Sequence, residues 1–160
     1  MRIAKKDSGE KSVSYAEALE VALCYGWIDG QKRSESESTW LQRFTPRGKQ
    51  SIWSKINREK ALTLIEAKRM HPAGLAEVER AKKDGRWERA YDSWSTAEPP
   101  EDLLRALGAN ARAKAFFAKL DSKNRYAILF RIHGAKRPET REKRIRQFVE
   151  MLDKGKTIYP

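Results

Sequence analysis

The chain lacks the features of several common protein classes. Its 160 residues include a single cysteine, Cys24, so no disulfide can form within the chain. The two histidines, His71 and His133, lie far from each other and from Cys24, and this spacing does not fit a zinc site. We therefore predict no metal site and no cofactor. No apolar run approaches the roughly 20 residues that span a membrane, so we predict no transmembrane segment.

Signals for export and for familiar catalytic sites are also missing. A secretory signal needs an apolar run behind its basic residues, and none follows Met1 to Asp7. We therefore expect the protein in the cytoplasm. The sequence has neither the glycine spacing of a P-loop nor a Gly-Xaa-Ser-Xaa-Gly motif, and no pair of catalytic carboxylates is evident. These absences favour a non-enzymatic protein.

Charge is what the chain has in abundance. Charged residues make up 35% of the chain and the net charge is +12. Residues 111–160 hold 14 basic and 5 acidic side chains, which is most of this excess. A positive field attracts anions such as nucleic acid, phosphate compounds and acidic surfaces. Five residues each of Trp, Tyr and Phe favour a folded domain over a disordered chain.

The first part of the chain predicts a helix followed by a β-hairpin. Ser14 and Glu17 fit a capping box, and the helix that they open ends at Gly26. Residues 27–33 and 39–45 have the composition of two strands joined by a polar loop. A third short strand is predicted at residues 3–5.

The rest of the chain predicts helices. Ser51, Ser54 or Asn57 can cap the first of them, and Pro72 suits the first turn of the second. Further helices are predicted from about Glu101, from Asn110, from Asp121 or Ser122, and from Pro138. We therefore predict an α+β protein: an N-terminal part over residues 1–90 with a hairpin at 27–45, a linker at 91–100, and a basic all-helical part at 101–160.

The hairpin offers one candidate site. Alternate side chains of a strand share a face, so Trp27, Asp29 and Gln31 point the same way. Pairing of the two strands would place Asp29 near Gln42 or Arg43 and Trp27 near Phe44. An acid and an arginine beside aromatic rings are what a small-ligand pocket needs, and a small-molecule enzyme with its site at Trp27, Asp29 and Arg43 is one alternative. A purely structural core with a neutralising ion pair is the other.

The loop after the hairpin predicts an anion site. Free amide groups at a helix N-terminus favour anions, and basic side chains in the preceding loop strengthen that preference. The ligand-binding residues predicted from the hairpin and this loop are Trp27, Asp29, Gln31, Arg43, Phe44, Arg47, Lys49, Ser51 and Trp53.

Nucleic-acid binding by the C-terminal helices is the main alternative function. Phosphate contacts need a contiguous basic patch, and a solvated charged helix would show a similar composition. The residues that would form such a patch are Arg125, Arg131, Lys136, Arg137, Arg141, Lys143 and Arg144.

Several long motifs give the chain a family resemblance. The stretches are Leu19 to Arg33 (LEVALCYGWIDGQKR), Gln42 to Arg47 (QRFTPR), Ser51 to Asn57 (SIWSKIN), Pro72 to Val78 (PAGLAEV), Asp84 to Trp87 (DGRW), Phe116 to Leu129, and Ala135 to Arg141 (AKRPETR). They resemble the YdeI/OmpD-associated, or bacteriocin-protection, family (OmdA-like). The resemblance implies a stress or protection role in an envelope setting and carries no catalytic residue or cofactor. We expect a non-enzymatic protection protein whose partner is an anionic small molecule, an anionic protein or nucleic acid.

Overall fold

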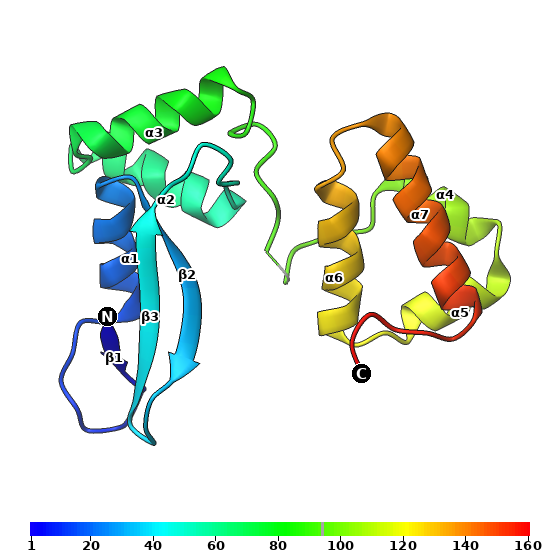
Figure 1. The fold of residues 1–160 in the computed structure, drawn as a ribbon, viewed down its shortest axis with the longest axis horizontal. Coiled ribbons are helices and arrows are strands. Elements are labelled where there is room, and N and C mark those ends of the chain that lie inside the picture. The colour runs from blue at the N-terminus through cyan, green and yellow to red at the C-terminus, as the bar shows by residue number, and fades with distance from the viewer. Residues whose placement is uncertain (94) are drawn as a thin grey trace. The chain divides into compact units, whose positions relative to one another are not determined.

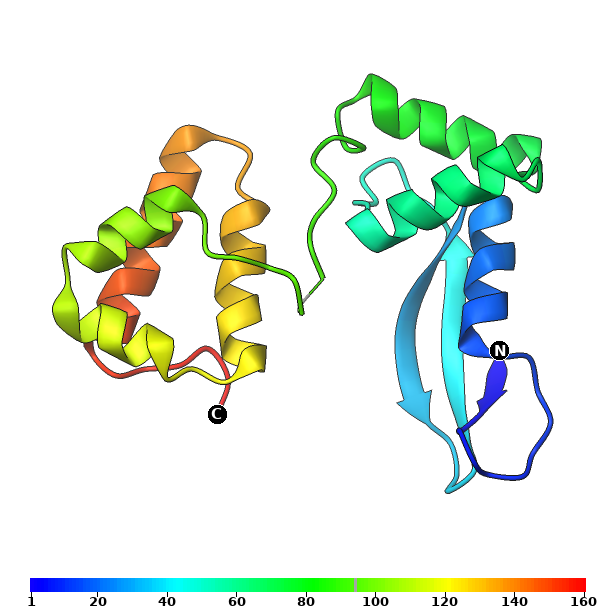
Figure 2. The same cartoon turned by 180° about the vertical axis from the view of Figure 1, so that it is seen from behind.

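The computed structural model describes residues 1–93 and 95–160 and divides them into two compact units, Met1–Ala90 and Tyr91–Pro160 (Figures 1 and 2). The linker expected at residues 91–100 includes Trp94, which lies outside the described residues. The first unit combines a sheet with helices and the second is helical, so the α+β class is confirmed. No helix in the described part of the chain is long and apolar enough to cross a membrane.

The sheet of the N-terminal unit has three antiparallel strands. They are β1 (Arg2–Ala4), β2 (Trp27–Ser34) and β3 (Thr39–Pro46), in the order β1-β3-β2. The predicted hairpin and short third strand are both present. The pairing differs from the expectation, because Trp27 lies opposite Pro46 and Asp29 opposite Phe44.

A bulge in β2 sets the register of the hairpin. Two residues, Gly30 and Gln31, oppose the single Arg43 between the pairs Asp29–Phe44 and Lys32–Gln42. The buried Gln42 amide donates to the carbonyl oxygens of Gly30 at 2.9 Å and of Arg43 at 3.0 Å. Its side chain therefore satisfies backbone groups at the bulge, where the regular strand pairing is interrupted.

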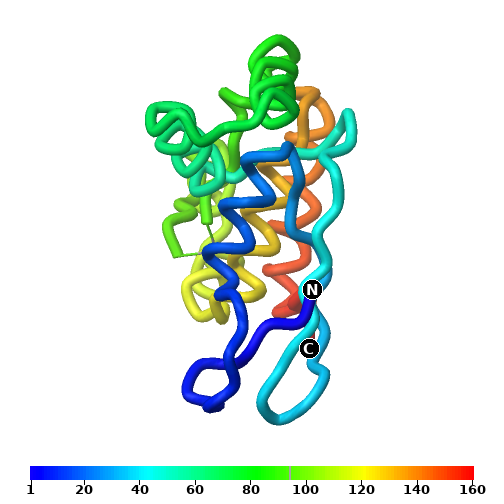
Figure 3. Tube along the Cα trace, turned by 90° about the vertical axis from the view of Figure 1, so that its left-hand side faces the viewer, coloured from blue at the N-terminus to red at the C-terminus, as the bar shows by residue number. Residues whose placement is uncertain are grey.

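Helix α1 (Tyr15–Cys24) lies along the sheet (Figure 3). The predicted capping box is present in full, with Ser14 accepting from the Glu17 amide and Glu17 accepting from the Ser14 amide. The Tyr15 ring packs against Trp40 and Phe44 of β3. The helix is followed by Gly26, whose φ of 74° is a left-handed conformation that favours glycine.

Helices α2 (Lys55–Glu66) and α3 (Pro72–Lys83) complete the N-terminal unit. Ser54, one of the three predicted caps, caps α2. The core between these helices and α1 contains Leu23, Trp53, Leu64, Val78 and Trp87.

The C-terminal unit contains four helices around a second core. They are α4 (Glu101–Gly108), α5 (Ala111–Ala118), α6 (Ser122–His133) and α7 (Pro138–Asp153). Asn110 and Asp121 cap α5 and α6, as the sequence predicts. The core side chains recur at helical spacing and include Leu103, Leu107, Ile128, Ile132 and Leu152.

An ion pair joins α4 to α7 inside this unit. Arg141 donates to both carboxylate oxygens of Asp102, at 2.5 and 2.9 Å, and to the carbonyl oxygen of Ile132 at 3.1 Å. These hydrogen bonds from Arg141, together with its charge, hold the pKa of Asp102 below its ordinary value against the opposing effect of burial. Arg141 thus links three helices.

The close approach of α1 and α3 gives a first prediction. A Cβ atom on Gly74 would lie within 3 Å of the carbonyl oxygen of Leu23, which is backbone and cannot move aside. We expect Gly74→Ala to lower the free energy of unfolding by about 1–3 kcal/mol. Urea denaturation of the full chain measures this. Gly30→Ala is the control, because its Cβ would meet only ordinary contacts at 3.8 Å or more; an equal loss in both variants would contradict the steric explanation.

The Asp102–Arg141 pair gives a second prediction, on pH. The pKa of Asp102 is lower in the folded protein than in the unfolded chain. The stabilisation that the Asp102 carboxylate gives to the fold is therefore complete above its unfolded pKa of about 3.9, and it is lost as the pH falls through its folded pKa. We expect Asp102→Asn to lose about 1 kcal/mol at pH 7 and to match the wild type at sufficiently low pH. Thermal unfolding across this pH range measures the difference. The exposed Glu150→Gln on α7 is the control, and a deficit that persists at low pH would show that the charge pair is not its cause.

Candidate functional site

The hairpin brings together only part of the predicted site. Trp27, Asp29 and Phe44 lie on the side of the sheet that faces α1. The Tyr15 hydroxyl donates to the Asp29 carboxylate at 2.8 Å. Arg43 lies opposite the bulge and is exposed, and no ion pair joins it to Asp29 in the described part of the chain. Gln31 is exposed within the bulge. The expected contact between acid and arginine is therefore wrong.

The pocket beside Trp27 is apolar. Its volume is about 330 Å³, and none of its described lining residues is a lysine or an arginine. The lining residues are Met1, Ala18, Val21, Ala22, Tyr25, Trp27 and Phe44. This composition suits an apolar group and does not suit an anion.

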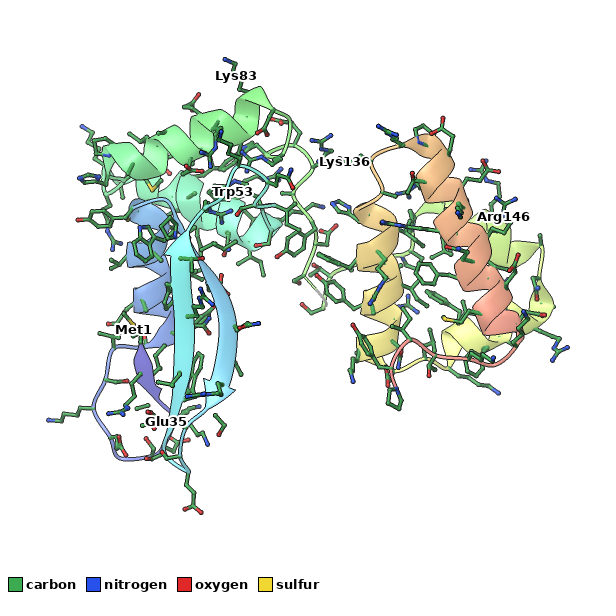
Figure 4. The ribbon with its side chains drawn as sticks, in the orientation of Figure 1. Met1, Glu35, Trp53, Lys83, Lys136 and Arg146 are labelled. Atoms are coloured by element: carbon green, nitrogen blue, oxygen red, sulfur yellow. The ribbon has the colours of Figure 1, made fainter. Side chains whose placement is uncertain are left out.

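The loop after β3 places Arg47 and Trp53 together. The Arg47 guanidinium lies over the Trp53 ring at 3.6 Å from its centroid and donates to the carbonyl oxygen of Ile52. Both side chains are buried, with exposed fractions of 5% and 1%. Trp53 also contacts the edge of Trp87 in the core. Figure 4 labels Trp53 where the end of β3, α2 and α3 meet.

Two further arginines, which the sequence did not predict as site residues, reach the same loop. Arg86 donates to the carbonyl oxygen of Ser51 at 2.6 Å, and Arg80 donates to those of Arg47 and Gly48, each at 3.3 Å. Arg47, Trp53, Arg80 and Arg86 are together called the arginine cluster below.

The acidic side chains that touch this cluster are already engaged. Glu77 accepts from Arg80, and both oxygens of Asp84 accept from Arg86 Nε at 2.8 Å. Desolvation acts to raise the pKa of Asp84, but the hydrogen bonds and the charge of Arg86 outweigh it and leave this pKa below its ordinary value. Arg80 and Arg86 are thus each paired with one carboxylate.

Buried N–H donors in the cluster exceed the acceptors that reach them. Trp53 Nε1, Arg80 Nε and Arg86 Nη2 are buried and have no acceptor among the described residues. Buried polar groups of folded proteins are almost always hydrogen-bonded. Within residues 1–93 and 95–160, no group of three or more His, Cys, Asp or Glu side chains is arranged to hold a metal ion. The chemistry that fits the cluster is that of an anion with oxygen acceptors.

The other predicted loop residues take different places. Ser51 Oγ accepts from the Gly48 amide within a tight turn, and Lys49 is exposed on that turn. Helix α2 is capped by Ser54, so Ser51 does not lie at its first turn. Arg80 and Arg86 were missed because their ion pairs with Glu77 and Asp84 are local and typical of solvated helices. The one signal in the sequence that could have pointed to Arg86 was the Asp84 to Trp87 motif.

Several of the predicted nucleic-acid residues have partners within the fold. Arg141 is paired with Asp102, Arg144 donates to the carbonyl oxygen of Arg131, and the Arg125 guanidinium lies over the Phe117 ring. Arg131 contacts Tyr159. The exposed members of the predicted set are Lys136, Arg137 and Lys143. About half of this set thus has a role inside the fold.

Comparison with known families divides the chain into two matched stretches. A domain of unknown function, DUF8412, matches residues 1–77, and the OmdA family, described as bacteriocin-protection, YdeI or OmpD-associated, matches residues 96–155. No curated protein and no solved structure matches the chain. The arginine cluster extends beyond the first match, since Arg80 and Arg86 follow residue 77. The C-terminal match confirms the predicted resemblance: residues 96–155 form an OmdA (bacteriocin-protection, YdeI or OmpD-associated) domain.

Proposed function

We propose that the protein is a non-enzymatic protection protein that binds an oxyanion, a carboxylate or a phosphate, at the arginine cluster. The observation that carries this proposal is the set of buried donors, Trp53 Nε1, Arg80 Nε and Arg86 Nη2, that have no acceptor in the described chain. The protection role is the one that the family description names, and it comes to this chain as part of the proposal.

The energetics favour a bound anion at this place. A buried donor without an acceptor costs about 1–3 kcal/mol, and several such donors lie in the cluster. An oxyanion supplies several acceptor lone pairs at once. Guanidinium groups match carboxylates and phosphates in geometry.

Access to the cluster comes from the side of Arg80. Its side chain is 37% exposed, whereas Arg47 and Arg86 are buried below it. The adjacent turn, with Gly48 and Lys49, is exposed. We expect a small anion to enter the cluster from this exposed side.

An enzyme at Trp27, Asp29 and Arg43 is the weaker proposal. The Asp29 carboxylate already accepts a hydrogen bond from Tyr15, and Arg43 lies apart from it. The two charged groups are therefore not placed to act on one substrate.

Thermal unfolding in phosphate tests the proposed function. A ligand that binds only the folded state at 100 times its Kd raises the unfolding free energy by about 2.7 kcal/mol. We expect phosphate to raise the Tm of the wild type above its Tm in chloride at equal ionic strength. This rise should disappear in Arg80→Gln. It should shrink in Trp53→Phe, which removes one donor and keeps a ring beneath Arg47.

The exposed Arg33→Gln on β2 is the matched control, because it changes the net charge equally without touching the cluster. Its phosphate response should equal that of the wild type. An equal rise in Tm with phosphate in all four proteins would show that phosphate acts as a general salt and does not bind at the cluster. The absence of any rise with phosphate, sulfate or acetate would overturn the proposal.

A further inference from the structure

A second surface with the properties of a binding site lies on α6. A groove of about 700 Å³ follows one side of this helix and is bordered by Tyr159. We call it the α6 groove. Its lining residues are Ser122, Lys123, Tyr126, Ala127, Phe130, Arg131 and Tyr159.

The far wall of the groove is fixed by a buried asparagine. Asn124 Oδ1 accepts from the amides of Ile158 and Tyr159 at 3.0 and 2.9 Å, and Asn124 Nδ2 donates to the Tyr159 carbonyl oxygen at 3.2 Å. Only 3% of Asn124 is exposed. The hydrogen bonds hold the Tyr159 backbone against α6, so the groove exists before any ligand arrives.

Two cations flank the Tyr159 ring. Lys123 Nζ lies 4.6 Å and the Arg131 guanidinium 5.7 Å from the ring centroid. Arg131 also donates to the Tyr159 hydroxyl at 3.3 Å. Neither cation forms an ion pair with a carboxylate in the part of the chain that the structure describes. Both charges are therefore available to an anionic ligand.

Aromatic rings form the rest of the groove. Phe130 is 36% exposed, and the Tyr126 ring lies beside it with 5.8 Å between the ring centroids. Tyr91 supports Phe130 from a second direction through an edge contact at 5.1 Å. An exposed phenylalanine on a charged helix, held by two other rings, is a surface on which a planar group can stack.

The signs of the charges distinguish this groove from its neighbour. None of the described lining residues of the α6 groove is acidic. A smaller pocket of about 180 Å³ shares Tyr126 and Phe130 but also includes Asp92 and Glu98, and its one arginine, Arg141, is already paired with Asp102. A polyanion is favoured in the first of these two and disfavoured in the second.

We propose that the α6 groove binds single-stranded nucleic acid. Lys123 and Arg131 contact phosphates, and an unpaired base stacks on Phe130 beside Tyr126. Cations beside exposed aromatic faces are the arrangement by which proteins bind single strands with little sequence preference. A duplex keeps its bases stacked inside and leaves Phe130 without a partner. This site is separate from the arginine cluster.

The proposal can be tested by fluorescence anisotropy with the full chain at several salt concentrations. The labelled probes are a single-stranded RNA, a single-stranded DNA of the same sequence, and a duplex of equal length. We expect the single strands to bind more tightly than the duplex. Phe130→Ala should weaken binding to the single strands about tenfold or more. Lys123→Gln should make the slope of log K against log salt shallower by about 0.7, the value for one phosphate contact on a single strand.

Matched controls separate this site from general charge. Lys136→Gln removes one exposed cation outside the groove, and Leu104→Ala removes an exposed apolar side chain from α4; Arg80→Gln alters the arginine cluster. All three should bind single strands like the wild type, apart from a small uniform loss for the two charge variants. Equal binding by Phe130→Ala and Leu104→Ala would overturn the proposal. So would tighter binding of the duplex, or a loss confined to Arg80→Gln, which would assign the affinity to the arginine cluster.

Discussion

The stacking of Arg47 on Trp53 is the contact on which the N-terminal unit depends. Arg47 follows the last residue of β3, and Trp53 precedes the cap of α2, so their contact joins the sheet to the helices through a short loop. Arg80 and Arg86 hold the backbone of the same loop from α3 and the segment after it. Buried cations are costly, and here each is offset by an aromatic face, carbonyl oxygens or a carboxylate. The same arrangement leaves donors that no acceptor of the described chain reaches.

Local signals in the sequence were sufficient to predict most of the elements. The Ser14–Glu17 capping box and the caps at Asn110 and Asp121 depend only on residues three or four positions apart, and all three are present. The core positions of α7, such as Ile145 and Leu152, follow helical periodicity. Arg47, Ser51 and Trp53 were predicted as neighbours because they are neighbours in sequence. Their contact with Arg80 and Arg86 depends on how α3 packs, and no local pattern carries that information.

The hairpin register could not be predicted for a related reason. One extra residue in β2 shifts every pair on one side of it, and the bulge is stabilised by the Gln42 side chain reaching two carbonyl oxygens. Gln42 is only 3% exposed, yet its sequence neighbours give no sign of a buried amide.

In the C-terminal unit, the composition correctly indicated positive charge, but it did not indicate which cations form ion pairs within the fold. The helix packing makes that distinction: it pairs Arg141 with Asp102, and among the described residues no carboxylate pairs with Lys123.

The bulge has a consequence for how molecules of this protein meet one another. In the described sheet β2 is an edge strand, and a long regular edge is a template on which another chain can add a strand and begin to aggregate. The bulge interrupts the row of backbone groups, and the exposed Lys32 and Arg33 add charge just after it. A second copy approaching this edge meets like charges and a broken hydrogen-bond pattern. The irregularity that moved the register therefore also works against strand addition by a second copy.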